Sequence, residues 1–202
     1  MPNQRQRDEG SIHRTSITSL LENDLGVSRP LHISLSRPVA LPTADKDSFL
    51  PQLRQAVANA GIKAFATRPK DLAWHPNESS SRWFLVLRLE YTPELNRLLD
   101  VCNATATKFG QPLLYAGGDE GSPEKHETDD GQFHISLAWS LEAPQERDSE
   151  SIAIKALKSP AIEETGVPYE LLGQLGDISI SFAEVKVRIG QDVHNIALKP
   201  RR

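Results

Sequence analysis

The tetrapeptide His-Ile-Ser-Leu occurs twice in this chain, at residues 32–35 and again at residues 134–137. Each copy follows a bulky apolar residue, Leu31 in the first and Phe133 in the second. Side chains two residues apart on a β-strand share a face, so each His is expected beside its Ser, with Ile and Leu on the opposite face. If the two strands lie near one another, two imidazoles and two hydroxyls converge over a supporting apolar layer.

These four polar residues suit metal-free cleavage of an RNA phosphodiester by the neighbouring 2′-hydroxyl. The ordinary pKa of histidine, ~6.5, allows both protonation states near neutral pH. One neutral imidazole, of His32 or His134, would take the 2′ proton, and the other, protonated, would give a proton to the departing 5′ oxygen. The hydroxyls of Ser34 and Ser136 would donate hydrogen bonds to the non-bridging phosphate oxygens. The spacing leaves open which histidine is the base and which is the acid.

The interpretation depends on the repeat, because one His-x-Ser alone is a frequent chance match. A strand histidine satisfied by its neighbours would explain a single copy, whereas two copies in matching apolar contexts favour a functional pair. The sequence has no His-Glu-x-x-His, cysteine pair or Asp-His cluster with the spacing of metal ligands, so we expect no metal and no cofactor. It also has no Gly-x-Ser-x-Gly turn of the kind that serine hydrolases use.

Two aromatic residues are further candidates for contact with a base or with the substrate. Tyr115 and Trp139 could each stack on a base, and packing in the core or at its rim explains them equally well. Trp139 follows Ser136 by three residues, and on a regular strand this odd spacing would turn it away from the cleft. The other histidines are expected at the surface or in loops, and they are His13, His75, His126 and His194.

The composition is that of a globular protein, with 202 residues of which 38% are hydrophobic and 25% charged. Cys102 is the single cysteine, so no intrachain disulfide can form and a reducing compartment is expected. No apolar run reaches the length of a membrane span, and the polar first ten residues have no apolar core of a secretory signal. The net charge of −4 argues against a protein that coats nucleic acid, but it permits a locally basic groove for a few nucleotides.

The order of the expected elements, with one copy of the tetrapeptide in each half of the chain, predicts two related lobes. We expect an α+β fold of two pseudo-symmetric lobes, each a small antiparallel sheet with outer helices, and an active-site groove between them. Strands are expected at residues 31–36, 62–68, 83–90 and 133–139, with a closing hairpin over 178–189 and 193–198. Helices are expected at residues 45–60 and 93–109, and shorter ones at 16–25, 149–157 and 169–175. Residues 117–131 are expected to form a loop. We expect residues 1–29 to be a partly disordered N-terminal segment and residues 30–202 to form one two-lobed domain.

The two His-x-Ser motifs also resemble those of the two-histidine (2H) phosphoesterases. Together with residues 109–115 and 187–198, they resemble more specifically the U6 small nuclear RNA phosphodiesterase family, in its fungal form. The resemblance extends over roughly residues 29–199. Its motifs are specific in combination rather than singly.

The resemblance implies a nuclear enzyme that trims uridines or adenosines from the 3′ end of U6 RNA, in the 3′-to-5′ direction. Members leave a terminal 2′,3′-cyclic phosphate or, in some cases, open it to a 3′-phosphate. The resemblance assigns catalysis to His32 and His134 and phosphate binding to Ser34 and Ser136. It implies RNA 3′ ends as the partner, and we expect a monomer that does not bind a membrane. The alternatives are a 2H phosphodiesterase acting on 2′,3′-cyclic nucleotides or tRNA ends, and a non-catalytic binder of RNA ends.

Overall fold

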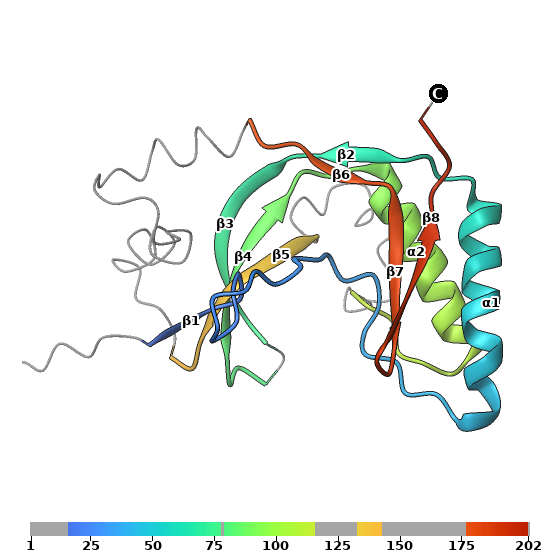
Figure 1. The fold of residues 1–202 in the computed structure, drawn as a ribbon, viewed down its shortest axis with the longest axis horizontal. Coiled ribbons are helices and arrows are strands. Elements are labelled where there is room, and N and C mark those ends of the chain that lie inside the picture. Colours follow the sequence, from blue (N-terminus) through green and yellow to red (C-terminus); the bar gives the residue numbers. More distant parts are fainter. Residues whose placement is uncertain (1–15, 78, 116–132, 143–176, 202) are drawn as a thin grey trace, which may run out of the picture.

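The computed structural model describes residues 16–77, 79–115, 133–142 and 177–201. In these residues the chain forms β1 (Ile17–Ser19), α1 (Thr43–Ala60), β2 (Phe65–Thr67), β3 (Pro69–Pro76), β4 (Trp83–Leu89), α2 (Pro93–Lys108), β5 (His134–Ser140), β6 (Ile180–Phe182), β7 (Glu184–Ile189) and β8 (Asp192–Ala197). A four-stranded antiparallel sheet has the order β1-β5-β4-β3, and two antiparallel pairs are formed by β2 with β6 and by β7 with β8. The four-stranded sheet lies to one side in Figure 1, and both helices and the β7–β8 hairpin lie to the other.

The two helices follow from their apolar spacing and their ends. The buried residues of α1 recur every four positions, at Phe49, Leu53 and Val57. The helix ends at Gly61, whose φ of 66° is the left-handed conformation that favours glycine. Pro93 occupies the first turn of α2, where its missing N–H costs nothing. The predicted helices at residues 45–60 and 93–109 are therefore confirmed.

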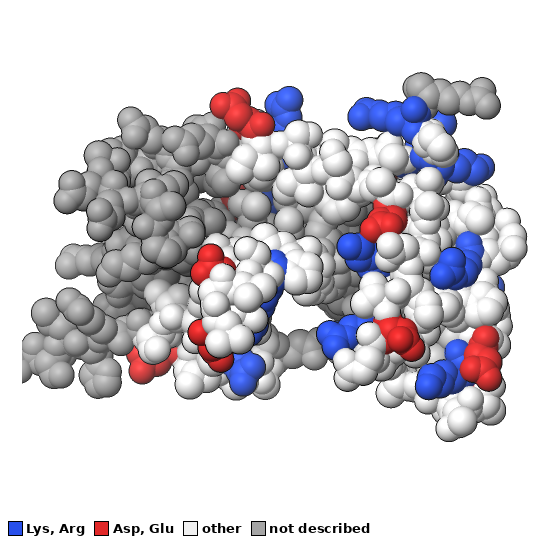
Figure 2. Space-filling view, in the orientation of Figure 1, with Lys and Arg blue, Asp and Glu red and all other residues white. Residues whose placement is uncertain are grey.

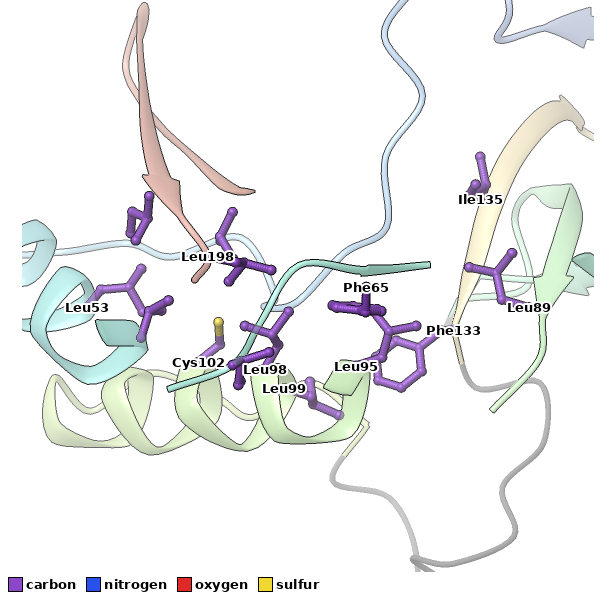
Figure 3. Packing of buried hydrophobic residues seen from close by; sticks show 14 of the residues in the cluster. Leu53, Phe65, Leu89, Leu95, Leu98, Leu99, Cys102, Phe133, Ile135 and Leu198 are labelled. Atoms are coloured by element: carbon purple, nitrogen blue, oxygen red, sulfur yellow. The ribbon is translucent and has the colours of Figure 1, made fainter. Parts of the chain in front are cut away.

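One hydrophobic cluster joins the helices to the strands of the sheet and of both smaller pairs. Leu53 of α1, Phe65 of β2, Ile135 of β5 and Val185 of β7 all belong to it. In Figure 3 the apolar side chains of α2 face this cluster, and they are Leu95, Leu98, Leu99 and Cys102. Neither described helix is long and apolar enough to cross a membrane.

The described residues confirm an α+β fold with small antiparallel sheets and two helices. They do not confirm the pseudo-symmetry of two lobes, because α1 and α2 pack on the same cluster instead of covering one sheet each. The helices expected at residues 149–157 and 169–175, and the loop expected at residues 117–131, lie outside the described residues.

The helix predicted at residues 16–25 is wrong. The segment instead forms β1, which pairs with β5, and then a turn in which the Asn23 carboxamide oxygen accepts the backbone N–H groups of Leu25 and Val27 at 3.0 and 2.9 Å. A short polar side chain of this kind offers the backbone local hydrogen bonds that compete with a helix. The turn closes with a bridge between Glu22 and Ser28, which leads the chain into the first His-x-Ser motif.

Candidate active site

The second His-x-Ser motif lies on β5, in the interior of the four-stranded sheet. Ile135 and Leu137 are 7% and 3% exposed, whereas His134 and Ser136 are only partly buried. His134 pairs across the sheet with Arg88 of β4. The expected alternation is confirmed here, with the polar pair on one face and the apolar pair on the core side. We call the face that carries His134 and Ser136 the motif face.

An ion pair lies beside His134 on the motif face. In the strand register Arg88 lies opposite His134 of β5 on one side and opposite Asp71 of β3 on the other. Its Nε and Nη2 groups donate to the two carboxylate oxygens of Asp71, which is the bidentate arrangement that fixes a guanidinium most firmly. Both side chains are about one-third exposed, at 31% and 32%. The row Asp71–Arg88–His134 therefore gives the histidine a neighbour of fixed orientation.

The expectation that Trp139 turns away from the motif face is wrong, because β5 contains a β-bulge. Val86 pairs with Ser136, but the preceding residue of β4, Leu85, pairs with Ala138, so β5 has one extra residue at this point. Phe84 then pairs with Trp139, and Phe84 shares a face with Val86. The bulge thus returns Trp139 to the face of Ser136.

A third histidine lies close to His134, and the sequence did not single it out. His75, near the end of β3, has its ring centroid 6.3 Å from that of His134, with 17° between the ring planes. It was expected at the surface or in a loop. The side chain is indeed exposed, but it belongs to a strand of the sheet and faces His134. Its place depends on the pairing of three strands, which no local pattern reveals.

The first His-x-Ser motif is not on a strand, so the strand predicted at residues 31–36 is wrong. In the four-stranded sheet β5 already has β1 on one side and β4 on the other, and no edge of β5 is left for this segment. Pro30 and Pro38, which lack the N–H that a strand ladder needs, flank it. The alternation survives without a ladder, because His32 and Ser34 are exposed while Ile33 and Leu35 pack against the core cluster.

Side chains hold this segment, residues 31–41, which we call the motif arm. Gln111 accepts the backbone N–H of Ala40 through Oε1 and donates to the Ala40 carbonyl through Nε2, both at 2.9 Å. Arg37 Nε donates to the carbonyl of Leu113 at 2.9 Å. Residues 111–113, which contributed to the sequence resemblance, thus serve as the partner of the motif arm in place of a strand.

Tyr115 lies against the residue that precedes His134. Its ring meets that of Phe133 edge-to-face, with centroids 6.1 Å apart. Burial raises the pKa of its hydroxyl from 10.0 to about 12, so the phenol is neutral at any physiological pH. Its φ of 59° is unusual for a residue other than glycine. Packing therefore accounts for Tyr115, and its contact with substrate stays a prediction.

Both motifs border the same core cluster, which contains Ile135 and Leu137 and packs against Ile33 and Leu35. Figure 2 shows the surface hollowed between the part with the four-stranded sheet and the part with the helices, with Lys and Arg side chains on both sides.

The described residues contain no group of three or more His, Cys, Asp or Glu that could hold a metal ion. The direct meeting of His32 with His134 stays a prediction.

Comparison with known proteins defines the class. Residues 4–197 match the HVSL family, which is described as an uncharacterised conserved protein, and the chain belongs to this family. U6 snRNA phosphodiesterase 1 of Neurospora crassa is 31% identical over 200 residues, covering 90% of this chain and 51% of that protein. The chain thus spans about half the length of this curated relative. The likeness predicted from the motifs is confirmed.

Two solved structures show the fold. Usb1 of Kluyveromyces marxianus with uridine monophosphate has a TM-score of 0.58 and 22% identity, over 92% of this chain and 83% of that one. Usb1 of the same organism in a second structure has a TM-score of 0.57 and 20% identity, over 92% and 82%. The mixed arrangement of small antiparallel sheets and two helices is therefore shared with Usb1.

Proposed function

We propose that this protein is a metal-independent RNA phosphodiesterase that removes nucleotides from the 3′ end of RNA, with the oligouridine end of U6 small nuclear RNA as its substrate. The observation that carries the proposal is the alternation in both motifs. In each copy the His and Ser lie on the side away from the core, and the Ile and Leu pack inward. The name of the Neurospora crassa relative supports the choice of substrate.

In the proposed reaction the 2′-hydroxyl of the penultimate nucleotide attacks the adjacent phosphorus. A neutral imidazole takes the 2′ proton as the new P–O bond forms. The bond from phosphorus to the 5′ oxygen breaks, and the second imidazole, protonated, gives its proton to that oxygen. The terminal nucleoside leaves, and the shortened RNA ends in a 2′,3′-cyclic phosphate. Attack of water on this ester would open it to a 3′-phosphate.

His32 and His134 are the proposed proton-transfer residues, and Ser34 and Ser136 are the proposed donors to the non-bridging oxygens. A positioned acid or base typically contributes about 10²–10⁴ in rate, so loss of either imidazole should nearly abolish cleavage. Loss of one donor to a developing oxyanion costs about 10²–10³.

A nuclear location, an RNA partner and a monomeric state complete the proposal. Nuclear location follows from the substrate, because the name of the relative refers to a small nuclear RNA. Size-exclusion chromatography with light scattering should give a mass near 22.4 kDa, the mass of one chain. A dimeric mass would contradict the monomer.

The test uses oligouridylate with a free 2′,3′-diol, incubated with the purified protein in EDTA. Stepwise shortening is expected, with loss of activity in His32→Ala and in His134→Ala. His194→Ala, which removes a histidine from the β7–β8 hairpin, is the matched control and should cleave normally. Inhibition by EDTA would refute the two-imidazole mechanism.

The product and the nucleophile are checked in the same system. Mass analysis of the new 3′ end distinguishes a cyclic phosphate from a 3′-phosphate. An RNA with a 2′-deoxy penultimate nucleotide should stay intact, because it lacks the attacking oxygen. A protein that leaves oligouridylate whole but opens 2′,3′-cyclic nucleotides would instead be the cyclic phosphodiesterase. One that binds the RNA end without cleaving either substrate would be an end binder.

A further inference from the structure

A row of aromatic and imidazole side chains crosses the motif face beyond Ser136. His75 of β3 pairs with Phe84 of β4, and Phe84 pairs with Trp139 of β5. Phe84 and Trp139 are partly buried, and His75 is exposed. Aromatic side chains on an open sheet face are a common platform for the bases of single-stranded RNA.

A cation is held over one end of this row. The guanidinium carbon of Arg82 lies 4.7 Å from the ring centroid of Trp139, within the range of a cation–π interaction. The turn before β4 fixes the backbone of Arg82, because the carboxamide oxygen of Asn77 accepts the N–H groups of Ser81 and Arg82 at 2.9 and 3.1 Å. Arg82 is exposed, so the N–H groups of its guanidinium can reach a ligand.

The other end of the row approaches the proposed catalytic site. The ring centroids of His75 and His134 are 6.3 Å apart, with 17° between the ring planes. If His134 serves the scissile phosphate, His75 lies directly beside that phosphate, where the neighbouring nucleotide of the strand would also lie. The row and the catalytic histidine occupy one continuous face of the sheet.

The chemistry of the 3′ end decides which phosphate this is. On the 3′ side of the scissile phosphate an exonuclease substrate has only the terminal nucleoside, with no further phosphate. A second phosphate can thus lie only on the 5′ side. His75 and Arg82 could both donate to this second phosphate. Two such donors are consistent with the overall charge of −4, because the binding of a few nucleotides needs basic groups only along their path.

We propose that His75, Arg82, Phe84 and Trp139 form a subsite for the nucleotide on the 5′ side of the cleavage site. His75 and Arg82 donate hydrogen bonds to its phosphate from the two sides of Phe84, which pairs with His75 and follows Arg82 by two residues. The Phe84–Trp139 pair supports its base. The identity of the bound strand rests on the proposed function. The four residues themselves come from β3, β4 and the turn between them, and from β5.

The subsite is tested by binding, so that the result does not depend on cleavage. The ligands are a uridine dinucleotide and a uridine trinucleotide, each with a 2′-deoxy sugar at the position of the nucleophile. Only the trinucleotide has the second phosphate, and the unsubstituted protein should bind it more tightly. In His75→Ala and in Arg82→Ala this advantage should fall about tenfold, the effect expected for one hydrogen bond to a charged group.

Salt dependence separates a phosphate contact from a structural role. Loss of the ionic contact in Arg82→Ala should reduce the slope of log affinity against log salt concentration by about 0.7, the value for single strands. Arg82→Lys keeps the charge and should keep the slope. Arg54→Ala, an exposed arginine on α1, is the matched control and should change neither quantity. Folding of each variant is checked by its thermal unfolding.

The outcomes distinguish this subsite from the proposed activity. Unchanged dinucleotide-to-trinucleotide ratios and salt slopes in both alanine variants would refute the subsite, even if the protein cleaves RNA. The alanine variants could show the predicted loss of the trinucleotide advantage in a protein that leaves the ribo-trinucleotide intact. That result would support the subsite and refute the activity. A trinucleotide that the unsubstituted protein binds no more tightly than the dinucleotide overturns the subsite directly.

Discussion

Gln111→Ala is expected to loosen the motif arm, and its cost can be worked from three hydrogen bonds. Oε1 of Gln111 accepts the N–H of Ala40, and Nε2 donates to the carbonyls of Ala40 at 2.9 Å and of Phe109 at 3.2 Å. A hydrogen bond contributes about 0.5–1.5 kcal/mol net, and water replaces part of it in this partly exposed place, so the loss should be roughly 1–2 kcal/mol. A chain of this size loses about 2–4 °C in Tm for each 1 kcal/mol.

Gln111→Glu sharpens the test because it changes only the donor. The carboxylate can still accept the N–H of Ala40, but its second oxygen then faces the carbonyl oxygens of Ala40 and Phe109. Two acceptors in contact repel one another, so this variant should be at least as destabilised as Gln111→Ala. Gln52→Ala, on the exposed side of α1, is the matched control and should unfold like the parent.

The assay combines thermal unfolding with single-turnover cleavage of oligouridylate at 25 °C, where the variants remain folded. A slower cleavage step in folded protein reports a displaced His32 rather than a loss of native molecules. If Gln111→Ala matches Gln52→Ala in both Tm and rate, core contacts alone hold the motif arm. The reasoning from the Gln111 bonds would then be wrong.

Three further changes probe the core and one helix end. Leu95→Ala removes a side chain that is 1% exposed and should cost about 2–5 kcal/mol in denaturant unfolding, while Leu141→Ala at 66% exposure should cost almost nothing. Burial raises the pKa of the Cys102 thiol from 9.0 to about 11. The unfolded chain therefore ionises first, and stability should fall between pH 9 and 11, less so in Cys102→Ala. Gly61→Ala places a Cβ 3.2 Å from Lys199 Nζ at a φ of 66° and should cost about 1 kcal/mol or more by the same unfolding measurement.

Elements with a local signal were predicted from the sequence. The apolar positions of α1 and α2 recur at helical spacing within each segment, and Gly61 ends α1 in the conformation expected of glycine. The alternation around His134 likewise predicts the face of the strand on which its side chain lies. Each of these predictions depends on residues that are neighbours in sequence.

Features set by distant pairing were missed. Trp139 regains the motif face only because Leu85 and Val86 of β4 pair with residues of β5 that lie two apart. His75 reaches His134 through the register of β3, β4 and β5. Neither arrangement leaves a trace in local periodicity, since a bulge and a strand order are properties of the assembled sheet.

The two copies of the tetrapeptide show what such a repeat can specify. An extended segment alternates its side chains whether or not a neighbour pairs with it, so Ile33 and Leu35 can face the core without a ladder. The repeat therefore specifies on which side of the backbone the four side chains lie. Pairing in a sheet is only one of the ways in which the backbone of such a segment can be held in place. At β5 the backbone ladder holds the strand that carries His134, whereas side chains such as Gln111 hold the motif arm, which carries His32, at Ala40. Changes far from either histidine should therefore affect the first motif more readily than the second.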